Sequence, residues 1–177
     1  PKDTIKNKNV IIIGPGSTVG KVKNKIERLI KKNNFFVISL NTTKNVNNTL
    51  INLRSACHPL RIYSDIYFHN KSNNNLALPL SMLPKKLRTL VAKNNKNFFD
   101  YGMAVHSKDS IIIKDKFCIL PKPLVIAYSI AISISGKANN IFLAGVDGYK
   151  KDDPSNDDTS HILKIFKEKY KKINIRS

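Results

Sequence analysis

The chain has 177 residues, of which 41% are hydrophobic and none is tryptophan. This length predicts one domain, residues 1–177, with a substantial core. The longest apolar run, near 124–134, is shorter than the ~20 residues that a membrane-spanning helix needs. The start "PKDTIKNKN" is polar and has no apolar core behind it. We therefore expect no signal peptide, no membrane span and a cytoplasmic location.

The formal net charge is +19, from 31 Lys and Arg against 12 Asp and Glu. Such a charge is compatible with nucleic-acid binding. The lysines, however, are spread over the whole chain and mixed with asparagines in tracts such as "KNNKN" and "NKSNNN". That composition is typical of solvated surfaces encoded by AT-rich genomes. We expect a general attraction to anionic small molecules and keep a basic nucleic-acid-binding domain as an alternative.

Two cysteines, Cys57 and Cys118, lie far apart in the sequence. Without a secretory signal, two free buried thiols are favoured over a disulfide. No metal-ligand spacing joins these cysteines to the four histidines. We therefore predict no metal site.

The predicted elements begin with a strand–helix–strand unit. An apolar run at 9–13 predicts a buried strand, an amphipathic pattern at 19–33 predicts a helix, and 35–40 predicts a second buried strand. Such a unit implies parallel strands with a right-handed crossover. The expected fold class is α/β: a three-layer, Rossmann-like, mostly parallel sheet with a glycine-rich loop after the first strand.

The later elements are predicted less sharply. In chain order they are a loop with a short helix at 41–59, a strand or edge segment at 61–68, a short strand at most at 76–83, a helix at 84–93, strand character at 111–120, a buried helix at 122–135 ended by Gly136, a last core strand at 140–144 and an amphipathic helix at 159–172.

The stretch "VIIIGPGSTVGKV" at 10–22 places glycines between the first strand and the first helix. A Walker loop is disfavoured, because five residues separate Gly14 from Gly20 and Lys21 is followed by valine. The spacing is a looser relative of the dinucleotide loop G-x-G-x-x-G. Asn41 stands where an NAD-binding sheet carries an acidic residue, which argues against NAD. NADP stays open, because Lys44 is near.

The glycines also have a structural interpretation. Gly14 and Gly16 would make a tight turn, and Ser17 or Thr18 would cap the helix that follows. An open helix start would attract an anion in either case. We therefore predict that the turn of Gly14, Pro15, Gly16, Ser17 and Thr18 binds a phosphate or similar anion.

Three segments, "VIIIGPGST", "VISLN" and "IFLAGVDGY", together resemble the small bacterial sialyltransferases with a Rossmann-like fold and related glycine-rich-loop domains from surface-polysaccharide genes. The resemblance implies CMP or a CMP-sugar as ligand and no required cofactor or metal. It further implies that Gly14–Ser17 face the nucleotide phosphate or ribose and that Asn41 contacts the cytidine. Tyr149 would contact the donor phosphate, and a later histidine would act as base. His161 is the one histidine after these motifs. Asp147 follows the last strand, where doubly wound sheets bind ligands.

The chain departs from that pattern at two places. Pro15 stands where the sialyltransferases usually have asparagine, and no second tyrosine soon follows Tyr149. His161 also has an alternative interpretation as a surface residue of the closing helix. These departures leave both a binding module and a transferase open.

A longer resemblance covers nearly the whole chain. The segments "ACHPLRIYSD", "SMLPKKL", "LPKPLVIAYSIAISISGKANNIFLAGVDGY" and "DDP" look like the C-terminal module of bacterial proteins whose N-terminal part is an aldolase barrel of the HMG-CoA lyase and pyruvate carboxyltransferase group. This resemblance implies a covalently linked aldolase domain and a role in lipopolysaccharide or capsule biosynthesis. Because the chain starts with Pro1, we expect it to be a piece of a longer protein. A non-catalytic accessory domain of that aldolase is the alternative function.

Three further residues are candidates for contact with an anionic substrate. His58 and Arg61 in "ACHPLR" are predicted to line the mouth of the cleft. A structural ion pair between Arg61 and Asp65 is the alternative. Cys57 is disfavoured as a nucleophile for His58, because neighbouring side chains point to different sides of a strand or helix. Lys122 at a helix start opposes the helix dipole, which we interpret as a sign of a bound anion.

Overall fold

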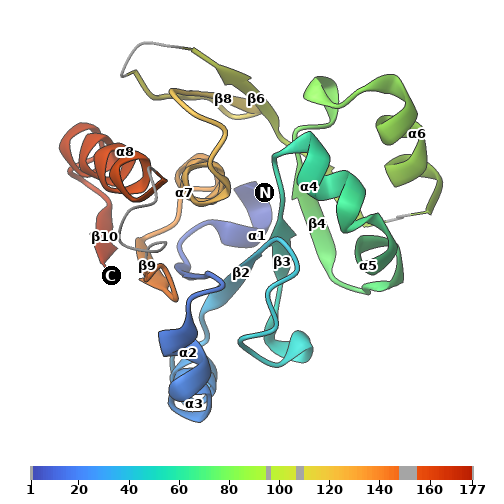
Figure 1. Ribbon diagram of the computed structural model, residues 1–177. Coiled ribbons are helices and arrows are strands. Elements are labelled where there is room, and N and C mark those ends of the chain that lie inside the picture. Colours follow the sequence, from blue (N-terminus) through green and yellow to red (C-terminus); the bar gives the residue numbers. More distant parts are fainter. Residues whose placement is uncertain (1, 95–96, 107–109, 148–154, 177) are drawn as a thin grey trace.

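The computed structural model describes residues 2–94, 97–106, 110–147 and 155–176. Seven parallel strands form its central sheet (Figure 1). They are β1 (Asn9–Ile13), β2 (Phe36–Leu40), β3 (Leu53–Ser55), β4 (Asn75–Leu78), β5 (Phe98–Asp100), β9 (Asn140–Ala144) and β10 (Asn174–Arg176). Their order across the sheet is β10-β9-β1-β2-β3-β4-β5, and every neighbouring pair is parallel. The predicted α/β, Rossmann-like class is thereby confirmed.

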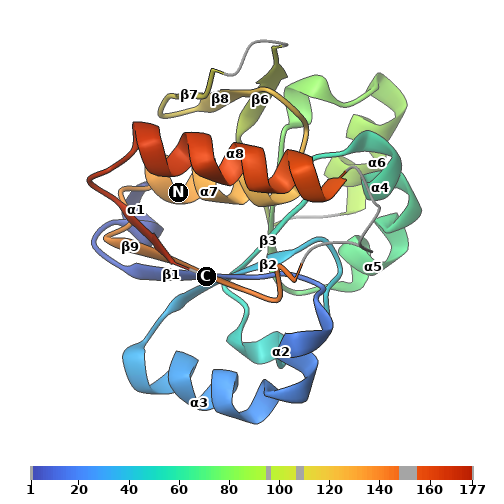
Figure 2. The ribbon, with the colours of Figure 1, turned by 60° about the vertical axis from the view of Figure 1, so that its left-hand side comes forward.

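Helices cover both faces of the sheet, so its central strands are apolar on both sides. Val10 and Ile12 of β1 face the layer of α1 (Lys2–Ile5), α7 (Val125–Ser135) and α8 (Ser155–Lys169). Ile11 and Ile13 face α2 (Ser17–Lys21) and α3 (Lys23–Asn33). Figure 2 shows α7 and α8 above the sheet and α3 beneath it.

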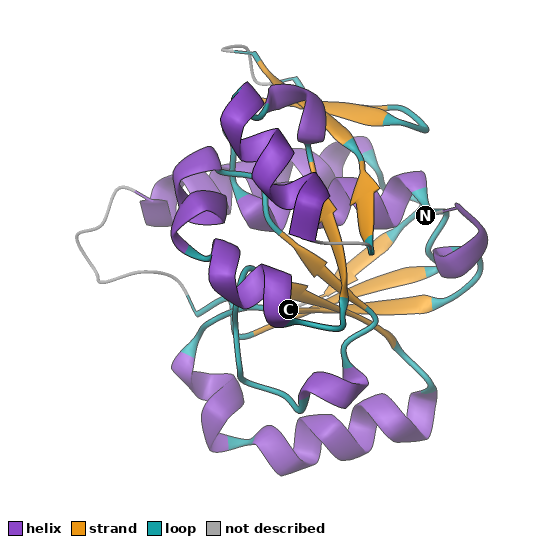
Figure 3. Cartoon of the chain, turned by 90° about the vertical axis from the view of Figure 1, so that its right-hand side faces the viewer, coloured by secondary structure: helices purple, strands orange, loops and turns teal. Residues whose placement is uncertain are grey.

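The face of the sheet that α2 and α3 cover also packs against a second group of helices, near β4. The helices α4 (Pro59–Ser64), α5 (Ile66–Lys71) and α6 (Lys85–Asn94) pack with Leu76 and Leu78 of β4, and Figure 3 shows this side of the molecule. The register pairs Ile13 with Ser39, Ser39 with Arg54 and Arg54 with Leu76. Residues in register on parallel strands point to the same face. Polar Ser39 and Arg54 therefore lie between the two apolar clusters of this face.

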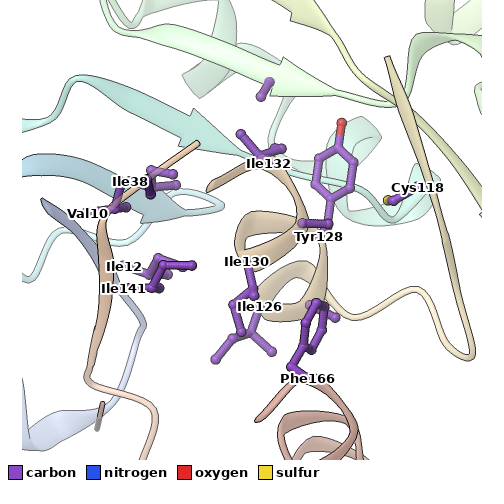
Figure 4. Packing of buried hydrophobic residues seen from close by; sticks show 14 of the residues in the cluster. Val10, Ile12, Ile38, Cys118, Ile126, Tyr128, Ile130, Ile132, Ile141 and Phe166 are labelled. Atoms are coloured by element: carbon purple, nitrogen blue, oxygen red, sulfur yellow. The ribbon is translucent and has the colours of Figure 1, made fainter. Parts of the chain in front are cut away.

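A small second sheet covers α7 from outside. It contains β6 (Gly102–Val105), β8 (Phe117–Leu120) and β7 (Ile112–Ile113), in that order. Two short 3-10 turns, at Asn48–Leu50 and Leu80–Met82, lie outside both sheets. The strand β7 pairs with β8 in antiparallel fashion. Because α7 lies between two sheets, it is buried from Ile126 to Ser133, as its nearly continuous apolar sequence predicts. Figure 4 shows Tyr128 of α7 and Cys118 of β8 in this core.

The hydroxyls of Tyr128, Ser55 and Ser129 form hydrogen bonds inside the core. The hydroxyl of Tyr128 donates to the carbonyl of Tyr101 at 2.6 Å, and the hydroxyls of Ser55 and Ser129 lie 2.6 Å apart. Cys57 and Cys118 are buried free thiols, as predicted. Burial raises the pKa of the Cys57 thiol to about 12, so it is protonated at neutral pH.

Several predicted elements need correction. The segment 61–68, predicted as a strand or edge segment, is helical: Ile62, Ile66 and His69 recur at helical spacing on the inner side of α4 and α5. The helix predicted at 19–33 is broken at Val22, where φ is −117° and ψ is 21°. The buried helix begins at Val125, after Pro123, and not at 122, and it ends at Gly136 as predicted. No helix within the described residues combines the length and apolar character of a membrane span.

Candidate functional site

The sheet changes its direction of winding between β1 and β9. The chain proceeds from β1 through β2 to β5 on one side and later adds β9 and β10 on the other. Doubly wound sheets bind ligands outside the carboxyl ends of the strands at such a switch point. A cavity of about 360 Å³ lies there, which we call the switch-point cavity. It is lined by Pro15, Gly16, Ser17, Leu40, Asn41, Leu124, Val125, Ile126, Gly145, Val146, Asp147 and Thr159. Its volume falls in the range of small-molecule sites.

The turn after β1 packs closely against the loop after β9. The N–H of Gly14 donates to the carbonyl of Ala144 at 2.8 Å, and that of Gly16 donates to the carbonyl of Gly145 at 2.8 Å. A Cβ on Gly14 would collide with the Gly145 carbonyl oxygen, and a Cβ on Gly16 would collide with the Asp147 carboxylate. Gly145 itself has a φ of +68°. These glycines allow two backbones to approach; Gly20, in contrast, lies in α2 with open space around it.

The carboxylate of Asp147 occupies the start of α2. It accepts a hydrogen bond from the Thr18 N–H at 2.9 Å and a second, short one from the Thr18 hydroxyl. These bonds lower the pKa of Asp147 below 3.8, so the group is ionised at neutral pH. Neither Ser17 nor Thr18 caps the helix as predicted, because the N-cap residue is Gly16 and it has no side chain. A protein carboxylate therefore stands where the sequence predicted a ligand phosphate.

Asn41 follows β2 at the edge of the cavity. Its φ of +50° lies in the left-handed region, which asparagine adopts more readily than most residues. Its N–H donates to the Ser55 carbonyl at 2.8 Å, and its carbonyl accepts from Arg54 at 3.1 Å. The backbone of Asn41 is thus held from both sides, and the residue lines the cavity.

Asn45 supports the glycine turn, a role that sequence reasoning missed. Its side-chain NH₂ donates to the carbonyls of Gly14 at 2.9 Å and Gly16 at 3.0 Å. The loop after β2 and the loop after β1 are therefore one connected unit. Nothing local distinguishes Asn45 from the other asparagines of its loop, so only the tertiary structure reveals this contact.

The N-terminus of α7 forms another wall of the cavity, through Leu124, Val125 and Ile126. The first N–H groups of a helix have no acceptor within the helix, and this end carries partial positive charge. The first turn of α7 contains no acidic residue. Lys122, predicted to hold an anion, is exposed and pairs with Asp158 of α8 at 2.5 Å. It lies close in sequence to this wall but does not line the cavity.

Three other predicted residues, His58, Arg61 and His161, lie away from the cavity. His58 and Arg61 are exposed and do not line the switch-point cavity. The Nε atom of Arg61 lies 2.9 Å from the Asp65 carboxylate, which is the structural alternative considered for this residue. His161 is exposed on α8, and two residues of helix turn it about 200° away from cavity-lining Thr159. Tyr149 lies outside the described residues.

No protein-family model matches the sequence, and no curated protein matches it. Within the part of the chain that the structure describes, no three His, Cys, Asp or Glu side chains are grouped so that they could hold a metal ion.

Proposed function

We propose that the chain is a cytoplasmic module that binds a nucleotide or nucleotide sugar of the CMP type in the switch-point cavity and serves the synthesis of a bacterial lipopolysaccharide or capsule. The observation that carries this proposal is the position of the cavity, at the carboxyl ends of β1, β2 and β9 and against the start of α7. The role in surface-glycan synthesis, and the attached aldolase domain, rest on the sequence resemblances alone.

The cavity walls match the parts of a nucleotide. Leu40, Val125 and Val146 offer apolar surface for a base and a sugar ring. The amide of Asn41 has a donor and an acceptor, which suits the edge of a pyrimidine. The ionised carboxylate of Asp147 accepts hydroxyl donors and repels phosphate. We therefore propose that the ribose lies toward Asp147 and the phosphate toward the start of α7.

Glycosyl transfer from a CMP-sugar is the reaction that the sialyltransferase resemblance implies. Such a transfer needs a base within reach of the acceptor hydroxyl. The histidine expected in that role, His161, lies on the exposed side of α8. The proposal is accordingly centred on binding, and transferase turnover is a separate measurement.

An accessory role beside a linked aldolase domain is the second candidate. The helices α4 and α5 expose Leu60, Tyr63 and Tyr67, with exposed fractions of 74%, 62% and 69%. Exposed large apolar side chains on two successive helices are compatible with contact to another protein surface. If the chain binds no nucleotide in a calorimetric titration, the accessory role is the function that remains.

The test is calorimetric titration with CMP, a CMP-sugar, UMP, ADP and NADPH. Asn41→Gly removes the side-chain amide and keeps the left-handed backbone accessible. We expect cytidine nucleotides to bind the wild-type chain and to bind this variant about tenfold more weakly, the equivalent of one or two hydrogen bonds.

Asn34→Gly is the matched control. Asn34 has a φ of +49° at the exposed end of α3, away from the cavity. This control should bind like the wild-type chain. No binding of any of the five compounds, or equal loss in both variants, would overturn the proposal.

A further inference from the structure

A second cavity, of about 430 Å³, lies on the face of the sheet that α2 to α6 cover. It opens between α3 and α5, over the polar stretch of β2 and β3. We call it the basic pocket. Its lining residues are Lys23, Lys44, Val46, Asn47, Asn48, Arg54, Phe68, Lys71 and Ser72. Four of these side chains are cationic and none is acidic.

Arg54 forms the floor of the basic pocket and is only 2% exposed. Its guanidinium donates to the side chains of Ser39, Asn48 and Asn74 and to two carbonyls of the loop after β2. Every one of these acceptors is neutral. Burial lowers the pKa of Arg54 to about 10, so it remains charged at neutral pH.

A buried charge is usually compensated by an opposite charge. No Asp or Glu carboxylate among the described residues lies within ion-pair distance of Arg54. The neutral oxygens accept hydrogen bonds from the Arg54 guanidinium, but they do not compensate its positive charge.

Two lysines add charge above this floor. The Arg54 Cζ lies 5.0 Å and the Lys44 Nζ lies 6.0 Å from the centre of the Phe68 ring, so two cations share one aromatic ring. The Lys71 Nζ lies 4.4 Å from the centre of the Tyr67 ring. Their mutual repulsion is a cost that a bound anion would remove.

The carboxylate of Glu27, which contacts two residues of the pocket lining, is already engaged. Lys23 lies at the rim, with its Nζ 3.9 Å from the Glu27 carboxylate. That same Glu27 oxygen accepts the Asn47 N–H at 2.7 Å. One carboxylate, with a side chain 19% exposed, thus stands against four cationic side chains, and the Asn47 backbone N–H holds it in place.

We propose that the basic pocket binds a multiply charged phosphate-class oxyanion: a diphosphate, free or as part of a nucleotide. The pocket is larger than a single phosphate needs, and its four cationic side chains disfavour an apolar ligand. It is distinct from the switch-point cavity, with which it shares no lining residue. The proposal therefore does not depend on the function proposed above.

The experiment is calorimetric titration of the chain with inorganic pyrophosphate at fixed ionic strength. Titration with orthophosphate tests whether a single phosphate is sufficient. Titration with ADP tests whether a nucleoside adds to the affinity. The double variant Lys44→Gln/Lys71→Gln removes two exposed cations and leaves Arg54 in place. Lys31→Gln/Lys32→Gln removes the same charge from the exposed last turn of α3.

We expect pyrophosphate to bind the wild-type and control chains, and to bind Lys44→Gln/Lys71→Gln at least tenfold more weakly, because charge-assisted contacts are lost. Backbone amide NMR shifts should concentrate at Asn48, Lys71 and Ser72. No binding to the wild-type chain, or equal weakening in both double variants, would overturn the proposal. Shifts centred on Gly145 would place the anion in the switch-point cavity and would also overturn it. CMP binding to Lys44→Gln/Lys71→Gln reports on the other cavity separately.

Discussion

Asp147 shows how one side chain sets the charge of the switch-point cavity. Its carboxylate is held at the start of α2 by two hydrogen bonds from Thr18. Helix starts favour negative charge, so the residue stabilises α2 and makes this position unfavourable for phosphate. The cavity therefore has a negative wall at α2 and a positive wall at α7.

The effect of Asp147 on stability should depend on pH. Because its pKa is lower in the folded chain than the ordinary 3.8, its contribution is present above pH 3.8 and is lost as the pH falls through the folded value. We expect Asp147→Asn to lower the free energy of unfolding by about 0.5–1 kcal/mol at pH 7, a typical capping value. Denaturant unfolding from pH 7 to pH 3 should show the two chains converging in acid. A difference that grows in acid would contradict this account.

Arg54 holds the loop after β2, and replacement should loosen that loop. Lysine keeps the charge but cannot reach five acceptors at once. We expect Arg54→Lys to lower the free energy of unfolding by about 2–3 kcal/mol, since buried acceptors lose their donors. Hydrogen exchange should accelerate in residues 41–48.

The matched control is Arg28→Lys on the exposed side of α3, which should change stability by less than about 0.5 kcal/mol. Equal effects of the two substitutions would show that Arg54 has no special structural role.

At this scale, the predictable site residues are those that directly follow a buried strand. Asp147 was chosen because doubly wound sheets bind ligands at the carboxyl ends of their strands, and Asn41 because of the sialyltransferase resemblance; both residues line the cavity. Asn45 and Arg54 were not, because their roles depend on loops that meet only in the folded chain. His58, Arg61 and His161 were chosen by residue type, and the structure does not bring them to the cavity.

Among the elements, the turn between β1 and α2 is the most constrained by its neighbour. We expect Gly16→Ala to lower the free energy of unfolding by about 2 kcal/mol, because its Cβ would overlap Asp147 and lie 2.6 Å from the Gly145 carbonyl oxygen. Thermal unfolding measures this change.

Gly20→Ala is the control, because open space surrounds Gly20 within α2. Alanine favours helix over glycine, so this variant should be about 0.5–1 kcal/mol more stable than the wild-type chain. A destabilised Gly20→Ala, or a neutral Gly16→Ala, would contradict the packing described here.

Elements were predictable where the apolar pattern is long. The strands β1, β2 and β9 and the helix α7 have continuous apolar sequences that only a buried position explains. The strands β3 and β10 were missed because each has three residues and β3 contains a buried arginine. The helices α4 and α5 were misassigned because aromatic and β-branched residues also favour strands.

For the whole molecule, the net charge of +19 is a poor guide to function when taken alone. The structure separates a general basic surface from the basic pocket, where Lys44, Arg54 and Lys71 have no carboxylate partner among the described residues. It also separates that surface from the switch-point cavity, whose charged residue is acidic. A nucleic-acid interface would instead gather cations and aromatic rings over an extended face. The net charge therefore does not show that the basic pocket and the switch-point cavity carry charges of opposite sign.

The central claim is that the switch-point cavity binds a cytidine nucleotide, and an amide NMR titration of the chain with CMP tests it most directly. The account predicts that the largest shifts occur at Gly16, Asn41, Ile126 and Gly145, on four separate segments that meet only at this cavity. It also predicts small shifts at Lys71 and Ser72 of the basic pocket. Absence of shifts at saturating CMP, or shifts confined to the basic pocket, would contradict the claim.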